Sequence, residues 1–314
     1  MAKGIGFGKT ILFGEHFVVY GLPGIAGAIS NKTICEATPA NGFEFVDKRP
    51  AVEGYKQTKK AEIASQLDAI KKRFTKNILQ KGVKITLAGD LECASGIGAS
   101  AALATSIARA LNEYYDLNLG DDEVNKIAFE AEEAGSGKGN VSGIDNTCST
   151  YGGMISFKKN LAAGQNKIST LRVKKPLRIV LASTGITQET KKVVADVKKE
   201  KEKNPERFEK IFSEYEHLYT KAIAALKEGD EEGIGKLMNH NQKLLEEITV
   251  SSPEIEEICQ TARSSGALGA KLTGTGRGGL VVCLAKDQKN QEKIAKAITQ
   301  KGLVAKIAEL GSQK

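Results

Sequence analysis

The sequence predicts an α+β protein with two lobes. Its 314 residues are enough for two domains of ordinary size. Short strand patterns alternate with helical patterns in the first half, and long helical stretches dominate the second half. Three glycine-rich segments and one acidic segment are spread over both halves. We therefore expect these segments to meet at a cleft between the lobes, where ligands commonly bind.

Apolar residues that alternate with polar ones indicate strands, and apolar residues three and four positions apart indicate helices. By these patterns, the strands of the first half are expected at Thr10–Val19, Gly24–Ala37 and Val83–Leu87. Its helices are expected at Lys59–Gln80, at Ser100–Leu111, and from a cap at Asp121 to a stop at Gly135.

The pattern of predicted elements changes after Gly153. Strands are then predicted at Leu177–Ser183, Leu280–Leu284 and Val304–Ile307. Helices are predicted at Pro253–Ser264, at Gln288–Gln300 and over the long stretch Glu189–Ile248, with breaks near Pro205 and Gly229. A polar stretch at 164–175 separates the two patterns of elements, so we expect an N-terminal domain at 1–170 and a C-terminal domain at 171–314.

Composition excludes several classes of protein. The chain is 40% hydrophobic, without the run of about 18 apolar residues that a transmembrane helix needs and without a signal peptide. Five cysteines without metal-ligand spacing indicate reduced thiols and a cytoplasmic protein. The net charge of +8 comes from lysines mixed with acids on helical stretches, without the interleaved aromatic residues of a nucleic-acid surface. We expect neither a nucleic-acid nor a membrane partner.

The segment Gly96–Ala102 has the features of a phosphate-binding turn. It follows a strand and opens a helix, so free backbone N–H groups and the positive end of the helix dipole converge on one point. Its spacing is neither that of a Walker A loop nor that of a dinucleotide-binding motif. The hydroxyl of Ser100 could bind Mg²⁺ there. A plain glycine turn with Ser100 as a helix cap is the alternative interpretation.

Two further residues suit phosphoryl transfer. Asp145 lies among small and polar residues, which indicates a loop, and its carboxylate could accept the proton of a substrate hydroxyl. Lys9 follows a glycine and could stabilise negative charge nearby. A capping role for Asp145 and a surface position for Lys9 are the alternatives.

Two more segments are candidates for contact with a ligand. The pair Glu15 and His16 is of the kind that orients a polyol or a hydroxy acid, and His16 is one of only three histidines. The segment Thr273–Gly279 has four glycines in seven positions, including Gly274. Such density costs conformational entropy and indicates close backbone approach to another loop or to phosphates.

Together these motifs resemble those of the GHMP kinases, the family of galactokinase, homoserine kinase, mevalonate kinase and phosphomevalonate kinase. The resemblance covers nearly the whole chain. The segments that match the motifs are Lys9–Gly21, Ser95–Ala102, Ser142–Gly153 and Lys271–Gly279. Within the family, the Glu-His-x-Val-Val-x-Gly ending of the first motif is most similar to the mevalonate kinases. The segments Asp47–Val52 and Ser95–Ser100 are especially like the trypanosomatid form.

The resemblance implies a fold, a reaction and a set of site residues. The fold is a ribosomal-protein-S5-like N-terminal lobe with a ferredoxin-like C-terminal lobe, and the reaction is transfer of phosphate from ATP to the C5 hydroxyl of mevalonate with Mg²⁺. Asp145 would be the catalytic base and Lys9 its partner. The ATP-phosphate loop would comprise Ser95, Gly96, Ile97, Gly98, Ala99, Ser100 and Ala101. Mevalonate would be bordered by Glu15, His16, Thr187, Thr190, Thr273 and Gly274.

The metal ligands implied by the resemblance are Ser100 and a glutamate. Here Glu132 precedes Asp145 by 13 positions, about two more than the family's usual spacing, and the intervening segment 134–141 lacks the usual His-Gly-x-Pro. Glu133 is therefore the alternative ligand. Lys138, in the same segment, is a candidate phosphate contact. The sequence does not reveal the oligomeric state, although members of the family are often homodimers.

Other functions remain open from the sequence. Another GHMP kinase, acting on phosphomevalonate, homoserine or a sugar, would carry the same motifs. A non-catalytic member of the fold is a third interpretation, and the presence of Lys9, Ser100 and Asp145 argues against it.

Overall fold

The computed structural model describes residues 1–94, 96–138, 141–162 and 166–313. These residues form two compact units. Unit 1 comprises residues 1–9, 28–152 and the C-terminal end, and unit 2 comprises residues 10–27 and 153–312. Two strands, β1 (Ala2–Phe13) and β2 (Pro23–Pro39), contribute residues to both units. The domain boundary predicted at residue 170 and the cleft predicted between the lobes stay predictions.

The sheet of unit 1 carries its hydrophobic core on one face. Besides β1 and β2, its strands are β3 (Phe43–Asp47) and β4 (Val83–Gly89). Strand β4 pairs antiparallel with β2 and parallel with β3. Alternate residues of β4, namely Val83, Ile85 and Leu87, are fully buried, as the two-residue period of a strand requires.

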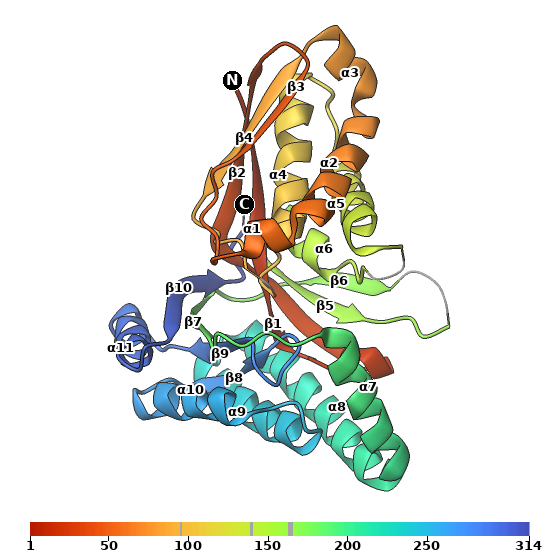
Figure 1. The fold of residues 1–314 in the computed structure, drawn as a ribbon. Helices are drawn as coiled ribbons and strands as arrows, with labels where there is room; N and C mark the ends of the chain where they lie inside the picture. The colour runs from red at the N-terminus through yellow and green to blue at the C-terminus, as the bar shows by residue number, and fades with distance from the viewer. Residues whose placement is uncertain (95, 139–140, 163–165, 314) are drawn as a thin grey trace. The chain divides into compact units, whose positions relative to one another are not determined.

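Helices of unit 1 cover that face. They are α1 (Tyr55–Thr58), α2 (Lys60–Arg73), α3 (Thr75–Gln80), α4 (Ala99–Tyr114), α5 (Asp121–Ser136) and α6 (Ile144–Tyr151). Helices α2, α4 and α5 pack on one another and on the sheet (Figure 1). Strand β1 approaches α4 closely, because Gly6 has no side chain: a Cβ there would lie 2.3 Å from the carbonyl oxygen of Ala102. This close approach brings the strand that carries Lys9 alongside the helix that carries Ser100.

Unit 2 contains a ferredoxin-like arrangement. Its strands are β7 (Leu177–Ser183), β8 (Gly269–Thr273), β9 (Leu280–Leu284) and β10 (Val304–Leu310). They pair antiparallel in the order β10-β7-β9-β8, with helices between β7 and β8 and between β9 and β10. Helix α10 (Pro253–Ser264) packs on β8 and β9, and α11 (Gln288–Thr299) packs on β7 and β10.

The remaining elements of unit 2 bring residues 10–27 into its core. Strands β5 (Met154–Lys158) and β6 (Lys167–Leu171) pair with each other, and β5 pairs with the first residues of β2. Helices α7 (Thr190–Lys203), α8 (Pro205–Glu228) and α9 (Glu231–Glu247) follow in sequence. The short 3₁₀ helix Phe17–Tyr20 is fixed on α8, because the rings of Phe17 and Tyr215 stack with centroids 4.0 Å apart.

The α+β class predicted from the sequence is confirmed, and several element predictions are wrong in detail. The strand expected at Thr10–Val19 ends at Phe13, and residues 17–20 are helical. The helix expected at Lys59–Gln80 is divided at Phe74. The residue that caps α5 is Gly120 instead of Asp121. Strands β3, β5 and β6 were not predicted.

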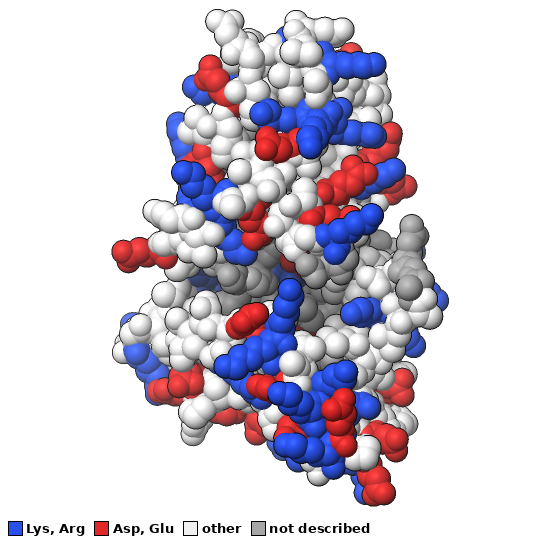
Figure 2. Space-filling model, turned by 45° about the vertical axis from the view of Figure 1, so that its right-hand side comes forward, with Lys and Arg blue, Asp and Glu red and all other residues white. Residues whose placement is uncertain are grey.

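Charges of both signs are mixed on the visible surface of the protein (Figure 2). On the face shown in Figure 2, Lys and Arg side chains are interspersed with Asp and Glu side chains, and no broad surface of one sign is visible. Among the described residues, no helix has the length and apolarity to cross a membrane.

Candidate active site

The predicted phosphate loop forms a turn and the first residues of α4. Gly96 and Gly98 have φ of 90° and 73°, in the left-handed region that favours glycine. The backbone N–H of Lys9 donates to the carbonyl of Ile97 at 2.8 Å, and a Cβ on Gly98 would lie 3.3 Å from the Lys9 nitrogen. The turn is therefore held tightly against β1. Ser95 lies outside the described residues.

The first backbone N–H groups of α4 have no partner within the helix and are available to an anion, as at any helix N-terminus. Ala99 and Ala101 are buried, whereas Ser100 is partly exposed. The loop residues predicted as Gly96, Ile97, Gly98, Ala99, Ser100 and Ala101 are thus contiguous with a 16-residue helix whose dipole favours negative charge at this end.

Lys9 and Asp145 form an ion pair beside this turn. Lys9 Nζ lies 2.9 Å from Asp145 Oδ1. Burial is the largest influence on Lys9 and opposes its charge, but the attraction and hydrogen bond of Asp145, with smaller contributions from Cys148 and Glu132, raise the pKa of Lys9 above its ordinary value. The side chain of Lys9 is 9% exposed and that of Asp145 is 32% exposed, so the carboxylate can still be reached from solvent.

The prediction that Asp145 lies in a loop is wrong. Asp145 is in the first turn of α6, which begins after Gly143 with φ of 84°. An acid in the first turn of a helix is stabilised by the helix dipole. The helix is held at its start by the hydroxyl of Thr147, which donates to the carbonyl of Gly143 at 2.6 Å.

Glu132, near the end of α5, points its carboxylate into the same region. It is buried and accepts a hydrogen bond from the backbone N–H of Asn146, while its Oε2 has no partner among the described residues. Burial first, and the charge of Asp145 second, raise the pKa of Glu132 to about 8. Glu133, the alternative ligand, is half-buried.

These residues fit a divalent cation. A buried carboxylate oxygen without a partner is costly, and a cation would satisfy it. In the part of the chain that the structure describes, no group of three or more His, Cys, Asp or Glu side chains could hold a metal. Mg²⁺ does not require such a group, since it commonly uses one or two protein oxygens together with phosphates and water.

In unit 2, Glu15 and Lys271 form an ion pair in the interior. Lys271 Nζ lies 2.6 Å from Glu15 Oε1, and both side chains are fully buried. Burial raises the pKa of Glu15 and lowers that of Lys271, against the attraction between the two charges. Sequence reasoning did not identify Lys271 as a functional residue. Its only signal was its place at the start of the third glycine-rich motif.

His16, Thr190 and Thr275 are neighbours. His16 Nε2 lies 2.6 Å from the carbonyl oxygen of Thr275, and the hydroxyls of Thr190 and Thr275 are 2.7 Å apart. Burial lowers the pKa of His16, which therefore favours the neutral ring. Thr275 was not predicted as a site residue. Thr187 is exposed in the segment before α7.

Thr273 ties the third motif to strand β1. Its hydroxyl donates to the carbonyl of Ile11 at 3.0 Å and lies 3.1 Å from the hydroxyl of Thr10. The next residue, Gly274, has φ of 91° and open space where a side chain would stand. The predicted unit 2 residues of the site therefore belong to connected segments. Thr187 belongs to them as well, because the carbonyl of the preceding Ile186 accepts a hydrogen bond from the backbone N–H of Gly279 at 2.7 Å.

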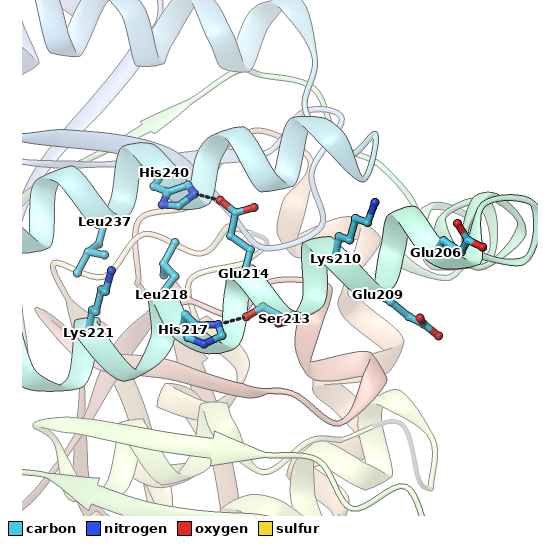
Figure 3. A pocket seen from close by; sticks show the side chains of 10 residues that line it. All are labelled: Glu206, Glu209, Lys210, Ser213, Glu214, His217, Leu218, Lys221, Leu237 and His240. Atoms are coloured by element: carbon cyan, nitrogen blue, oxygen red, sulfur yellow. Dashed lines mark hydrogen bonds and ion pairs between the residues drawn. The ribbon is translucent and has the colours of Figure 1, made fainter.

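A separate hollow runs along α8 and α9 (Figure 3). Its volume is about 810 Å³, and its walls include Glu214, His217 and His240. His240 Nε2 lies 2.6 Å from Glu214 Oε1. None of the described residues predicted for the site lines it, and its charged, exposed walls differ from the enclosed apolar lining of most small-molecule sites.

The chemistry of the unit 1 residues is that of phosphoryl transfer. A helix N-terminus can hold phosphate, a carboxylate with an unsatisfied oxygen can hold a cation, and a solvent-accessible carboxylate paired with lysine can accept a proton. The roles predicted for individual residues stay predictions.

Comparison with known proteins agrees with this chemistry. The model of the GHMP kinases N-terminal domain matches residues 62–153, and that of the GHMP kinases C-terminal region matches residues 222–304. The chain is 33% identical to a mevalonate kinase of Thermococcus gammatolerans, over 97% of this chain and 95% of the relative. It is also 33% identical to a mevalonate kinase of Pyrococcus horikoshii, over 97% and 94%.

A solved structure is similar over the full length. The crystal structure of L. major mevalonate kinase in complex with R-mevalonate matches with a TM-score of 0.90 and 39% identity. The match covers 100% of this chain and 97% of that one.

Proposed function

This chain belongs to the GHMP kinase family, and on that premise we propose that it transfers the γ-phosphoryl group of ATP to the C5 hydroxyl of mevalonate. It is a small-molecule kinase, an ATP:mevalonate 5-phosphotransferase, as the sequence motifs predicted. The observation that carries the mechanism is the 2.9 Å pair of Lys9 and Asp145 beside the N-terminus of α4.

Asp145 is the proposed base. Its carboxylate accepts the proton of the C5 hydroxyl as the hydroxyl oxygen bonds to the γ-phosphorus and the bond from that phosphorus to the β–γ bridging oxygen breaks. The products are 5-phosphomevalonate, ADP and a proton. Lys9 pairs with the Asp145 carboxylate before the reaction and stabilises the charge that develops on the transferred group.

The nucleotide is proposed to bind with its phosphates on the turn Gly96–Ser100 and the N-terminus of α4. Ser100 and Glu132 would hold Mg²⁺, and the partnerless Oε2 of Glu132 supports this. When bound, Mg²⁺ neutralises phosphate charge and favours transfer. Glu132 must lose its proton to bind a cation, which the raised pKa opposes and the cation's charge favours.

The acceptor is proposed to lie against the unit 2 residues. His16, Thr190 and Thr273 offer a neutral ring and two hydroxyls, groups that suit a hydroxy acid. Gly274 offers backbone without a side chain. Glu15 is fully buried and paired with Lys271, so we propose that it acts by fixing the backbone next to His16.

We also propose that the protein is cytoplasmic. The five cysteines are buried free thiols, which suits the reducing cytoplasm. A homodimer, and the lack of a nucleic-acid partner, stay predictions from the sequence.

An ADP-release assay with Mg·ATP tests the function. The acceptors are mevalonate, 5-phosphomevalonate, homoserine and galactose, each at the same concentration. We expect turnover with mevalonate and background rates with the other three. Turnover with a different acceptor would overturn the substrate and keep the reaction class. If the folded protein gave no ADP release with any of the four acceptors, a binding role for this fold would be favoured.

A further inference from the structure

Gln66 of α2 contacts the candidate metal ligand Ser100. Its Nε2 donates a hydrogen bond to Ser100 Oγ. The residue is 1% exposed, and its other amide atom, Oε1, is buried with no hydrogen-bond partner among the described residues. Placing an amide in the interior costs free energy unless both of its ends are satisfied. One end is satisfied by Ser100, and the other is available to a group that enters the region.

The packing of α2 on α5 makes room for this side chain. Gly135 of α5 faces α2, and a Cβ there would lie 3.0 Å from Gln66 Cγ and 2.8 Å from Glu62 Cγ. The charge of Glu62 also contributes to the raised pKa of Glu132. Helix α2 therefore delivers two polar side chains to the region that contains Ser100 and Glu132.

The main chain of the same turn is held from another direction. Arg49 is buried and donates from Nη1 to the carbonyl of Ala99 at 3.0 Å, while its other nitrogens donate to Asp47. The backbone at the start of α4 is thus fixed by Arg49, which leaves the orientation of the Ser100 hydroxyl to Gln66.

We propose that Gln66 is a positioning residue for Ser100 in the metal–nucleotide complex. A serine hydroxyl has one proton and two lone pairs. The amide N–H of Gln66 occupies one lone pair, which fixes the rotamer of Ser100 and leaves the second lone pair for a cation. The free Oε1 accepts a hydrogen bond from water of the cation's hydration shell. This inference rests on the proposed function only in its assignment of a Mg·nucleotide to unit 1.

The test is a binding experiment without acceptor. The dissociation constant of a non-hydrolysable ATP analogue is measured by calorimetry, with Mg²⁺ and with EDTA, for wild type, Gln66→Leu, Ser100→Ala and the double variant. Loss of one hydrogen bond predicts that Gln66→Leu weakens Mg·nucleotide binding about three- to tenfold. Binding in EDTA should change less than about twofold, since the hydrogen bond acts on a metal ligand. The double variant should bind as Ser100→Ala does, because Gln66 acts through Ser100.

Two further variants complete the design. Gln66→Met keeps an unbranched chain without the N–H donor and should reproduce Gln66→Leu. Gln80→Leu, the same change at an exposed position of α3, should bind as wild type. The proposal would be overturned if Gln66→Leu weakened nucleotide binding equally with and without Mg²⁺, or did not weaken it at all. It would also be overturned if the losses of affinity in the two single variants multiplied in the double variant. Unfolding of both Gln66 variants would also overturn it, since it would assign Gln66 to stability. Wild type that passes this binding test but does not phosphorylate mevalonate would refute the substrate alone.

Discussion

Replacing Asp145 with asparagine removes the proposed base and keeps the shape of the side chain. The amide cannot accept the hydroxyl proton, and it no longer balances the charge on Lys9. Burial, which is the largest influence on Lys9 and lowers its pKa, is then opposed only by the smaller contributions of Cys148 and Glu132. The variant therefore changes both the acid–base chemistry and the charge state of the pair.

The expected losses of kcat and of stability follow from these two effects. General-base catalysis contributes about 10²–10⁴ in rate, so kcat should fall by that factor, or about 3–5 kcal/mol of barrier. Breaking a fully buried pair costs about 3–5 kcal/mol of stability. Asp145 is 32% exposed, so we expect a smaller loss of about 1–2 kcal/mol here. The KM values for both substrates should stay within about threefold, because the base acts in the transition state.

Steady-state ADP release at saturating Mg·ATP and mevalonate measures kcat, and thermal unfolding measures stability. Asp68→Asn is the matched control, since Asp68 is an exposed acid of α2 that lies 3.7 Å from Lys71. It should keep wild-type kcat. If Asp145→Asn retained more than about a tenth of wild-type kcat, the assignment of Asp145 as the base would be refuted.

Four further substitutions probe the site, one of them in a double variant. The pKa of Glu132 is 4.5 ordinarily and about 8 in the folded protein, so folding favours the protonated carboxyl. Without Mg²⁺, the free energy of unfolding therefore falls as the pH rises from about 4.5 to about 8. Glu132→Gln should therefore raise the melting temperature in EDTA at pH 8 by about 5 °C while it abolishes the effect of Mg²⁺ on nucleotide binding; a lower melting temperature would contradict the burial argument. Lys271→Met leaves the Glu15 carboxylate buried without its partner and should cost about 3–5 kcal/mol in urea unfolding. Adding Glu15→Gln should recover part of that loss, and two additive losses would show that the pair is not coupled. Arg49→Lys removes the hydrogen bond to Ala99 and should raise the KM for ATP about three- to tenfold, while the KM for mevalonate stays unchanged. Equal changes in both KM values would indicate a general structural role for Arg49.

Long helices were the part of the fold that local sequence predicted best. The breaks expected near Pro205 and Gly229 are confirmed, since α8 begins at Pro205 and ends before Gly229, whose φ is 73°. Proline in the first turn and glycine after the last are local signals that need no knowledge of the rest of the fold. Helix α10 was predicted with its observed bounds for the same reason.

Elements set by distant contacts were missed. Residues 17–20 read as a strand because Val18 and Val19 are β-branched, but stacking of Phe17 on Tyr215 holds them in a helical turn. Helix α6 consists largely of residues with low helix propensity, and most of its side chains are buried. Its stability comes from packing, which a single sequence does not reveal.

The same distinction applies to the site. The glycines, Lys9 and Asp145 were visible because their residue types and spacing match known motifs. Gln66 and Lys271 are functional candidates only through their partners in space, which lie 34 and 256 positions away in sequence. A buried glutamine in an otherwise ordinary helix gives no local signal of its role, and Lys271 was marked only by its place at the start of the third glycine-rich motif.

Helix α6 joins two proposed functions in adjacent residues. The carboxylate of Asp145 and the backbone N–H that supports Glu132, that of Asn146, are consecutive along the chain. A shift of this helix by a single residue would disturb both groups at once. Substitutions in α6 therefore cannot readily change the proposed proton acceptor and the proposed cation ligand independently, and loss of the helix would remove the support of both in one step.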